Sequence, residues 1–82
     1  KFNTCHGVWV STLRKTPEVW IADRANGRLE VYDMELTYVR TLSGYNAPCC
    51  FYESNGQMFV PELGSRVSIV DADDKVVARL GD

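Results

Sequence analysis

Apolar and polar residues alternate along most of this chain, in short runs separated by turn residues. Residues 19–42 show the pattern most fully, because apolar side chains occupy every second position of three successive runs. Asn26-Gly27, a dipeptide that readily takes the left-handed backbone angles of a hairpin turn, separates the first two runs. Residues 34–36 separate the second run from the third. A period of two is typical of β-strands, so this stretch predicts a β-meander.

The same alternation predicts eight short strands and no helix longer than a turn. We expect the strands at residues 6–11, 18–23, 28–33, 37–42, 49–53, 57–61, 66–71 and 75–80. Asn55-Gly56 provides a second hairpin signal. The acidic segment at residues 71–74 lacks the glycine and the closing glutamate of a helix-flanked calcium loop. We therefore interpret it as a solvated turn between the last two strands.

The second half of the chain repeats the first. Residues 3–10 align with residues 46–53, 20–23 with 59–62, 28–33 with 66–71, and 37–42 with 75–80. The differences in length fall in turns, where insertions are well tolerated. Two copies of a four-stranded unit of about 40 residues are typical of β-propeller blades. The chain is therefore predicted to be all-β, with one four-stranded antiparallel blade at residues 1–45 and a second at residues 46–82.

Composition narrows the possible partners. Nine basic and eleven acidic residues are interspersed among 82, which leaves a net charge of −2 and no basic patch for nucleic acid or a membrane surface. No apolar run approaches the roughly 20 residues of a membrane span. Lys1-Phe2-Asn3 begins no signal peptide, and we expect the chain to be part of a longer one. The sequence does not indicate where in or outside the cell the protein is located.

Cysteines and large aromatic residues have structural interpretations. The three cysteines form neither a CxxC pair nor a histidine-rich metal pattern. Cys49 and Cys50 are adjacent and point to opposite faces of a strand, so we expect that they do not bridge each other. We interpret them as small buried hydrophobic residues of that strand. Large aromatics contribute much of the buried area of a core. Four of them are expected to fill the space between packed blades: Trp9, Trp20, Phe51 and Phe59.

The segment VWIADRANGRLEVYD resembles the NHL repeat of six-bladed propellers. In that repeat a hydrophobic strand is followed by an Asp-Arg-x-Asn-x-Arg turn and a second hydrophobic strand. Asp23, Arg24, Asn26 and Arg28 occupy those turn positions. The resemblance implies a six-bladed ring, which three copies of a two-bladed chain would complete. We therefore expect a homotrimer.

Together with FNTCHGVWV, the same segment is similar to one blade of the peptidyl-hydroxyglycine amidating lyase propellers. There a Pro-His pair opens the inner strand, and its histidine is one of three zinc ligands on the central axis. The resemblance places His6 on a zinc histidine and Arg24 on an active-site arginine. Cys5 stands in place of the proline, Cys49 at the histidine position of the second blade, and Leu63 in place of its arginine.

The predicted blade geometry gives these residues one location. The first two strands of a blade are antiparallel, so the start of the first and the end of the second lie on the same face of the disc. His6, Arg24, Cys49 and Glu62 should share that face. We take Arg24, Glu62 and Cys49 as candidate ligand-binding residues, Arg24 also as a candidate catalytic residue, and His6 as a candidate metal ligand. The alternative for His6 is a core histidine bonded to a backbone carbonyl.

Other residues of the turn have a simpler interpretation. Asp23 and Arg28 are expected to hold it by hydrogen bonds, as aspartate commonly does in turns.

Two functions remain open. The first is a two-blade module that assembles with copies of itself into a closed propeller and presents a binding face to a small-molecule or peptide ligand. The second is a fragment of a zinc-dependent lyase-like enzyme whose site is completed by other blades or chains. One histidine cannot supply a three-histidine site alone, so we prefer the first. In a closed trimer, three copies of His6 would form a ring around the axis that could hold zinc.

Overall fold

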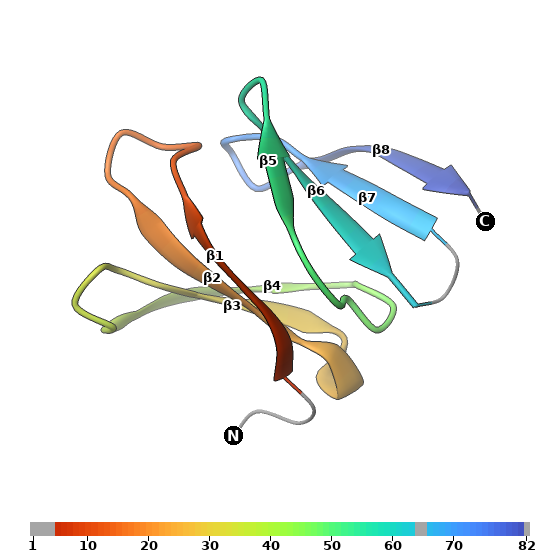
Figure 1. The fold of residues 1–82 in the computed structure, drawn as a ribbon, viewed down its shortest axis with the longest axis horizontal. Helices are drawn as coiled ribbons and strands as arrows, with labels where there is room; N and C mark the ends of the chain where they lie inside the picture. Colours follow the sequence, from red (N-terminus) through yellow and green to blue (C-terminus); the bar gives the residue numbers. More distant parts are fainter. Residues whose placement is uncertain (1–4, 64–65, 82) are drawn as a thin grey trace.

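Two four-stranded antiparallel sheets make up most of the computed structural model, which describes residues 5–63 and 66–81, with the side chains of residues 5 and 6 left out (Figure 1). The prediction of an all-β chain with two such sheets is confirmed. In both sheets the strand order follows the sequence. The first sheet contains β1 (Cys5–Ser11), β2 (Glu18–Asp23), β3 (Arg28–Tyr32) and β4 (Tyr38–Ser43). The second contains β5 (Tyr52–Ser54), β6 (Gln57–Glu62), β7 (Arg66–Val70) and β8 (Val76–Gly81).

A 3-10 helix of three residues, η1 (Arg24–Asn26), lies between β2 and β3. Within the described ranges, no helix is long and apolar enough to cross a membrane.

Strand β5 departs most from the expected bounds. We expected it at residues 49–53, and the structure begins it at Tyr52. Ala47 has a left-handed φ of 51°, and Pro48 makes only an isolated bridge to Glu62. Between Pro48 and Tyr52 the chain has one residue more than the facing part of β6, so regular pairing starts only at Tyr52.

The two hairpin signals behave differently. Asn55 and Gly56 both have positive φ, 51° and 77°, and form the predicted two-residue turn between β5 and β6. At Asn26-Gly27 only the glycine is left-handed, with φ of 65°, so the prediction was wrong for Asn26. Asn26 ends η1, and its side-chain nitrogen donates to Asp23 Oδ2 at 3.0 Å. This bond favours a longer connection over a two-residue turn.

The two sheets repeat one hydrogen-bonding plan, including its irregularities. Between the pairs Cys5↔Asp23 and Trp9↔Trp20, β1 has one residue more than β2. Its counterpart segment has the same extra residue between Pro48↔Glu62 and Tyr52↔Phe59. A second register shift occurs at the equivalent place in β3–β4 and in β7–β8. This shared register makes the alignment of the two halves a structural equivalence.

The β3–β4 and β7–β8 turns are also alike. Asp33 Oδ1 accepts bonds from the N–H groups of Glu35 and Thr37, at 2.9 Å each. Asp71 Oδ1 accepts the same pair two and four residues on, at 2.8 and 3.0 Å. Leu36 and Asp74 are the left-handed residues of the two turns, with φ of 65° and 66°. These two residues are therefore equivalent.

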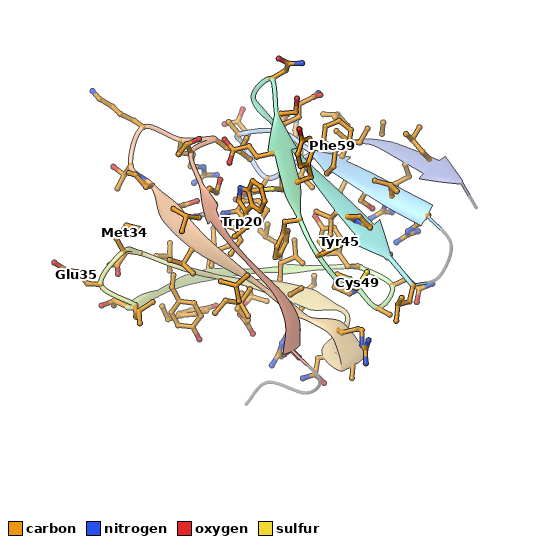
Figure 2. All side chains as sticks on the ribbon, viewed as in Figure 1. Trp20, Met34, Glu35, Tyr45, Cys49 and Phe59 are labelled. Carbon is orange, nitrogen blue, oxygen red and sulfur yellow. The ribbon has the colours of Figure 1, made fainter. Side chains whose placement is uncertain are left out.

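The sheets pack front to back. In β2 the buried apolar residues are Trp20 and Ala22, whereas in β6 they are Met58 and Val60, one position out of step with the repeat. Successive side chains of a strand point to opposite faces. The first sheet therefore buries one face, and the second sheet buries the other. Figure 2 shows Trp20 in the space between the sheets.

The core lies between these two inner faces. Trp20 meets Phe51 edge to face, with ring centroids 6.0 Å apart. Tyr45, in the connection between the sheets, is also buried here, and burial raises the pKa of its phenol to about 12. Phe59 does not join this core. It is half-buried on the opposite face of the second sheet, so our expectation that it fills the space between the two blades was wrong within this chain (Figure 2).

Two outer faces remain. On the first sheet, the side chains that point away from the core include Val8, Val10, Val19, Ile21, Tyr32 and Tyr38; we call this the β1–β4 outer face. On the second, they include Tyr52, Phe59, Pro61, Val67, Ile69, Ala78 and Leu80; we call this the β5–β8 outer face. Both faces are largely apolar.

At Gly7, strand β1 lies against the backbone of the segment that precedes β5. A Cβ placed there would lie 2.8 Å from Cys50 Cα and 2.9 Å from the carbonyl oxygen of Cys49. Both are backbone atoms, so no change of rotamer can relieve the contact. The absence of a side chain at Gly7 therefore sets the spacing between β1 and the segment that precedes β5.

Replacing Gly7 by alanine should force the sheets apart. We expect Gly7→Ala to lower the free energy of unfolding by about 1–3 kcal/mol, as overpacking does in other cores. Urea denaturation followed by tryptophan fluorescence measures the change. Glu35→Ala, at an exposed turn position, is the control and should stay within about 0.5 kcal/mol of the wild type. Equal stability of Gly7→Ala and the wild type would contradict the contact.

Candidate binding face

The start of β1 lies beside the end of β2, and the segment before β5 lies beside the end of β6. Cys5 pairs with Asp23, and Pro48 with Glu62. Arg24 begins η1 directly after β2. His6 lies in β1, but its side chain is outside the described part of the structure, so its role as a metal ligand stays a prediction.

Cys49 is held in the fold by the backbone of β6. Its N–H donates to the carbonyl oxygen of Pro61 at 3.0 Å, and its Sγ donates to the same oxygen at 3.4 Å. Burial and the neighbouring Cys50 raise the pKa of the Cys49 thiol, while the positive charge of Arg24 opposes the rise. Because the thiolate is the form that attacks electrophiles and binds metals, the raised pKa disfavours both roles at neutral pH.

Glu62 is committed to contacts inside the second sheet. Only 5% of it is exposed. Its carboxylate accepts bonds from Arg66 Nε at 2.9 Å, from the N–H of Asn46 and from the Ser68 hydroxyl. These bonds join the end of β6 to β7 and to the connection between the sheets. A ligand would have to compete with them, and the role of Glu62 in ligand binding stays a prediction.

Asp23 is the counterpart of Glu62 in the first sheet. It is fully buried, and its Oδ2 accepts from Asn26 Nδ2 and from Arg28 Nε, at 3.0 Å each. The expectation that Asp23 and Arg28 hold this turn by hydrogen bonds is confirmed. The bonds also explain the orientation of η1, because they fix the chain on both sides of it.

Metal ligands do not cluster among the side chains that the structure describes. No group of three or more histidine, cysteine, aspartate and glutamate residues there could hold a metal ion. The described donors of this face fit a metal poorly, because the Cys49 thiol is kept protonated and the Glu62 carboxylate is occupied. The zinc expectation depends on His6 alone.

A charged cluster between the sheets was missed by the sequence analysis. Arg40 donates to Glu18 at 2.7 Å through Nη1 and to Asp74 at 2.6 Å through Nε. Arg14 adds a second ion pair to Asp74, at 2.9 Å. Asp74 is therefore ion-paired and its side chain is only 17% exposed, which corrects our interpretation of it as solvated. The expected turn between the last two strands is present at residues 71–74. Arg40 and Asp74 are 34 residues apart in the sequence, and no motif indicates that they meet.

The pKa of one carboxyl group in this cluster, that of Glu18, is lowered. Burial on its own would raise the pKa of Glu18, but hydrogen bonds from Arg40 and Trp20 outweigh it and hold the pKa below its usual value. The same two carboxylates, Glu18 and Asp74, raise the pKa of Arg40. Glu18 and Arg40 are thus both charged across the physiological range.

A second polar contact joins the sheets at β1. Glu53 accepts from Trp9 Nε1 at 3.2 Å and from the N–H of Thr12 at 2.8 Å, and it also bonds the Thr12 hydroxyl. Burial would raise the pKa of Glu53, but the hydrogen bonds from Thr12, Trp9 and Ser11 lower it overall. Glu18 and Glu53 are thus both stabilised in the ionised form by hydrogen bonds.

Comparisons with known proteins found no family model that matches the chain and no curated protein that matches its sequence.

Loss of the Glu18 charge should weaken the fold only above its titration range. Its folded pKa is lowered, so its stabilising contribution is present above the unfolded value of about 4.3 and disappears as the pH falls through the folded pKa. We expect Glu18→Gln to lower the free energy of unfolding by roughly 1–2 kcal/mol at neutral pH, because it removes the charged acceptor of two hydrogen bonds from Arg40. At a pH below both pKa values, wild type and variant should unfold alike.

Urea denaturation at the two pH values measures this difference. Glu35→Gln, in the exposed β3–β4 turn, is the matched control and should follow the wild type at both. A Glu18→Gln deficit that is the same at acidic and neutral pH would contradict a contribution from the ionised carboxylate.

Proposed function

We propose that this chain is a self-assembling β-propeller module. Copies pack their outer faces against one another, close into a ring of sheets, and present the edge that carries Arg24, Cys49 and Glu62 as a binding face. The front-to-back packing of the two sheets is the observation that carries this proposal.

Front-to-back packing leaves the β1–β4 outer face and the β5–β8 outer face uncovered. The first sheet buries the face with Trp20 and keeps the opposite one open, and the second sheet does the reverse. The two open faces are therefore different and can each accept the other, as in a heterologous contact between subunits. Contacts of this kind repeat until a ring closes, or else they give an open filament.

The exposed side chains support such a contact. Val8 is 63% exposed on the β1–β4 outer face, and Tyr52 and Leu80 are 61% and 55% exposed on the β5–β8 outer face. Contiguous exposed apolar patches of this kind mark interaction surfaces. An isolated two-sheet chain of this size also buries a comparatively small fraction of its apolar surface, so covering these faces would add to its stability.

Val8 has a buried counterpart inside the chain. In the shared register it corresponds to Phe51, which packs on Trp20 across the observed contact. The counterpart of Trp20 is Phe59, on the β5–β8 outer face. Packing of Val8 on Phe59 of the next copy would therefore reproduce the aromatic centre of the contact already present.

The NHL resemblance supports three copies, because each chain supplies two sheets and that family forms rings of six. The zinc-dependent lyase alternative depends on His6, whose side chain lies outside the described residues, so we do not propose it as the function.

The assembly has a defined size. Size exclusion coupled to light scattering should give three times the chain mass of 9.3 kDa. Val8→Glu should shift the particle toward the mass of one chain, because the new carboxylate would be buried without a partner. Its circular dichroism should remain that of a folded β protein.

Thr16→Glu adds the same charge in the exposed β1–β2 loop and should leave the particle mass unchanged. A wild-type chain that stays at 9.3 kDa over the accessible concentration range would refute the self-assembly, and a polydisperse series of larger particles would refute its closure.

A further inference from the structure

We infer that the junction between copies is an apolar version of the contact between the two sheets within the chain. In it, Leu36 of one copy lies against Ala78 of the next, and Val10 lies against Tyr52. This inference rests on the self-assembly proposed above and adds which residues meet and why the junction forms in one orientation only.

The shared register identifies the counterparts. Arg40 pairs with Val31 in the first sheet, and Ala78 pairs with Ile69 at the same place in the second. Leu36 and Asp74 are equivalent left-handed residues of matching turns. The pair Asp74 and Arg40, which joins the sheets inside the chain, therefore corresponds to Leu36 and Ala78.

The contact between the two sheets within the chain is charged, but the corresponding positions on both outer faces are not. Inside the chain, Arg40 lies between Asp74 and Glu18, at 2.6 and 2.7 Å. The corresponding residues of the outer faces are Ala78, Leu36 and Gln57, all uncharged. Removing one partner of such a pair would leave a buried charge uncompensated, at considerable cost. On the outer faces all three charged residues are replaced by uncharged ones, so the two faces can pack together without an unpaired charge.

The second polar contact is replaced in the same way. Glu53 accepts from Trp9 and Thr12 inside the chain. The counterpart of Glu53 is Val10, and that of Trp9 is Tyr52. Here too an acidic residue and its donor correspond to two side chains that can pack without a carboxylate between them.

The β1–β2 loop shows the same change. It spans residues 12–17 and carries Arg14, which donates to the carbonyl oxygen of Ala72 at 2.7 Å and to Asp74 at 2.9 Å. In the second sheet the two-residue turn Asn55-Gly56 takes its place. The donor has thus been lost together with its acceptor, because Leu36 stands where Asp74 would be.

These replacements expose apolar side chains at positions whose counterparts are covered. Leu36 is 67% exposed, whereas the side chain of Asp74 is 17% exposed. Val10 and Tyr52 are 50% and 61% exposed. A second copy that docks its β1–β4 outer face on the β5–β8 outer face would cover all three. We identify the partner that covers these faces as a second copy of this chain, because the residue expected to pack on each position lies on the other outer face of the same chain.

Transplanting the inner ion pair into the junction tests this inference. Leu36→Asp or Ala78→Arg alone introduces an unpaired charge, and each should weaken assembly at least tenfold, as unpaired buried charges do. Leu36→Asp combined with Ala78→Arg recreates the pair formed by Asp74 and Arg40, and it should recover most of that loss. Aspartate suits the left-handed position, since Asp74 occupies the equivalent one.

The measurement is the dissociation midpoint in light scattering over a dilution series, with circular dichroism to confirm folding. Glu35→Lys changes the charge of the same turn, at its outer tip (Figure 2), and should leave the midpoint unchanged. If the wild type assembles and the double variant is no better than the worse single variant, the inference is overturned while self-assembly stands. If the wild type does not assemble, the proposed function fails as well.

Discussion

The rest of this structure depends on one constraint: each sheet buries only one of its faces. The face that the second sheet buries is the counterpart of the face that the first sheet leaves open. Each sheet carries apolar side chains on both sides, because alternate positions of its strands are apolar on either face. Stacking front to back buries Trp20 and Ala22 against Met58 and Val60. The same arrangement leaves two unlike apolar faces, and the core, the charged cluster and the proposed assembly all follow from it.

Local patterns predicted the strands well, since alternation and turn residues act over a few positions. They failed where longer-range packing decides the outcome. No alternation could tell which face of β6 is buried, since Phe59 and Val60 are equally plausible core residues; only the stacking selects Val60. Strand β5 began late because the segment between Pro48 and Tyr52 has one residue more than the facing part of β6. The turn at Asn26-Gly27 was predicted, but its two-residue form was not correct, because the Asn26 side chain bonds Asp23 and Asn26 ends η1.

The candidate face could be placed from the sequence but not understood from it. Antiparallel pairing is enough to bring the ends of β2 and β6 to the same edges as Cys5 and Pro48. The state of each side chain depends on its surroundings. Cys49 is kept protonated by burial and by Cys50, and Glu62 is occupied by its own sheet. Neither the charged cluster around Arg40 nor its neutral counterpart at Ala78 is visible until the register of both sheets is known.

An experimental structure of the assembled chain would test the central claim most directly. The account predicts that the β1–β4 outer face of each copy lies on the β5–β8 outer face of the next, with the same spacing and register as the two sheets within a chain. A twofold contact in which one outer face meets its own copy would contradict it. In that arrangement the packing between chains would not continue the packing inside them.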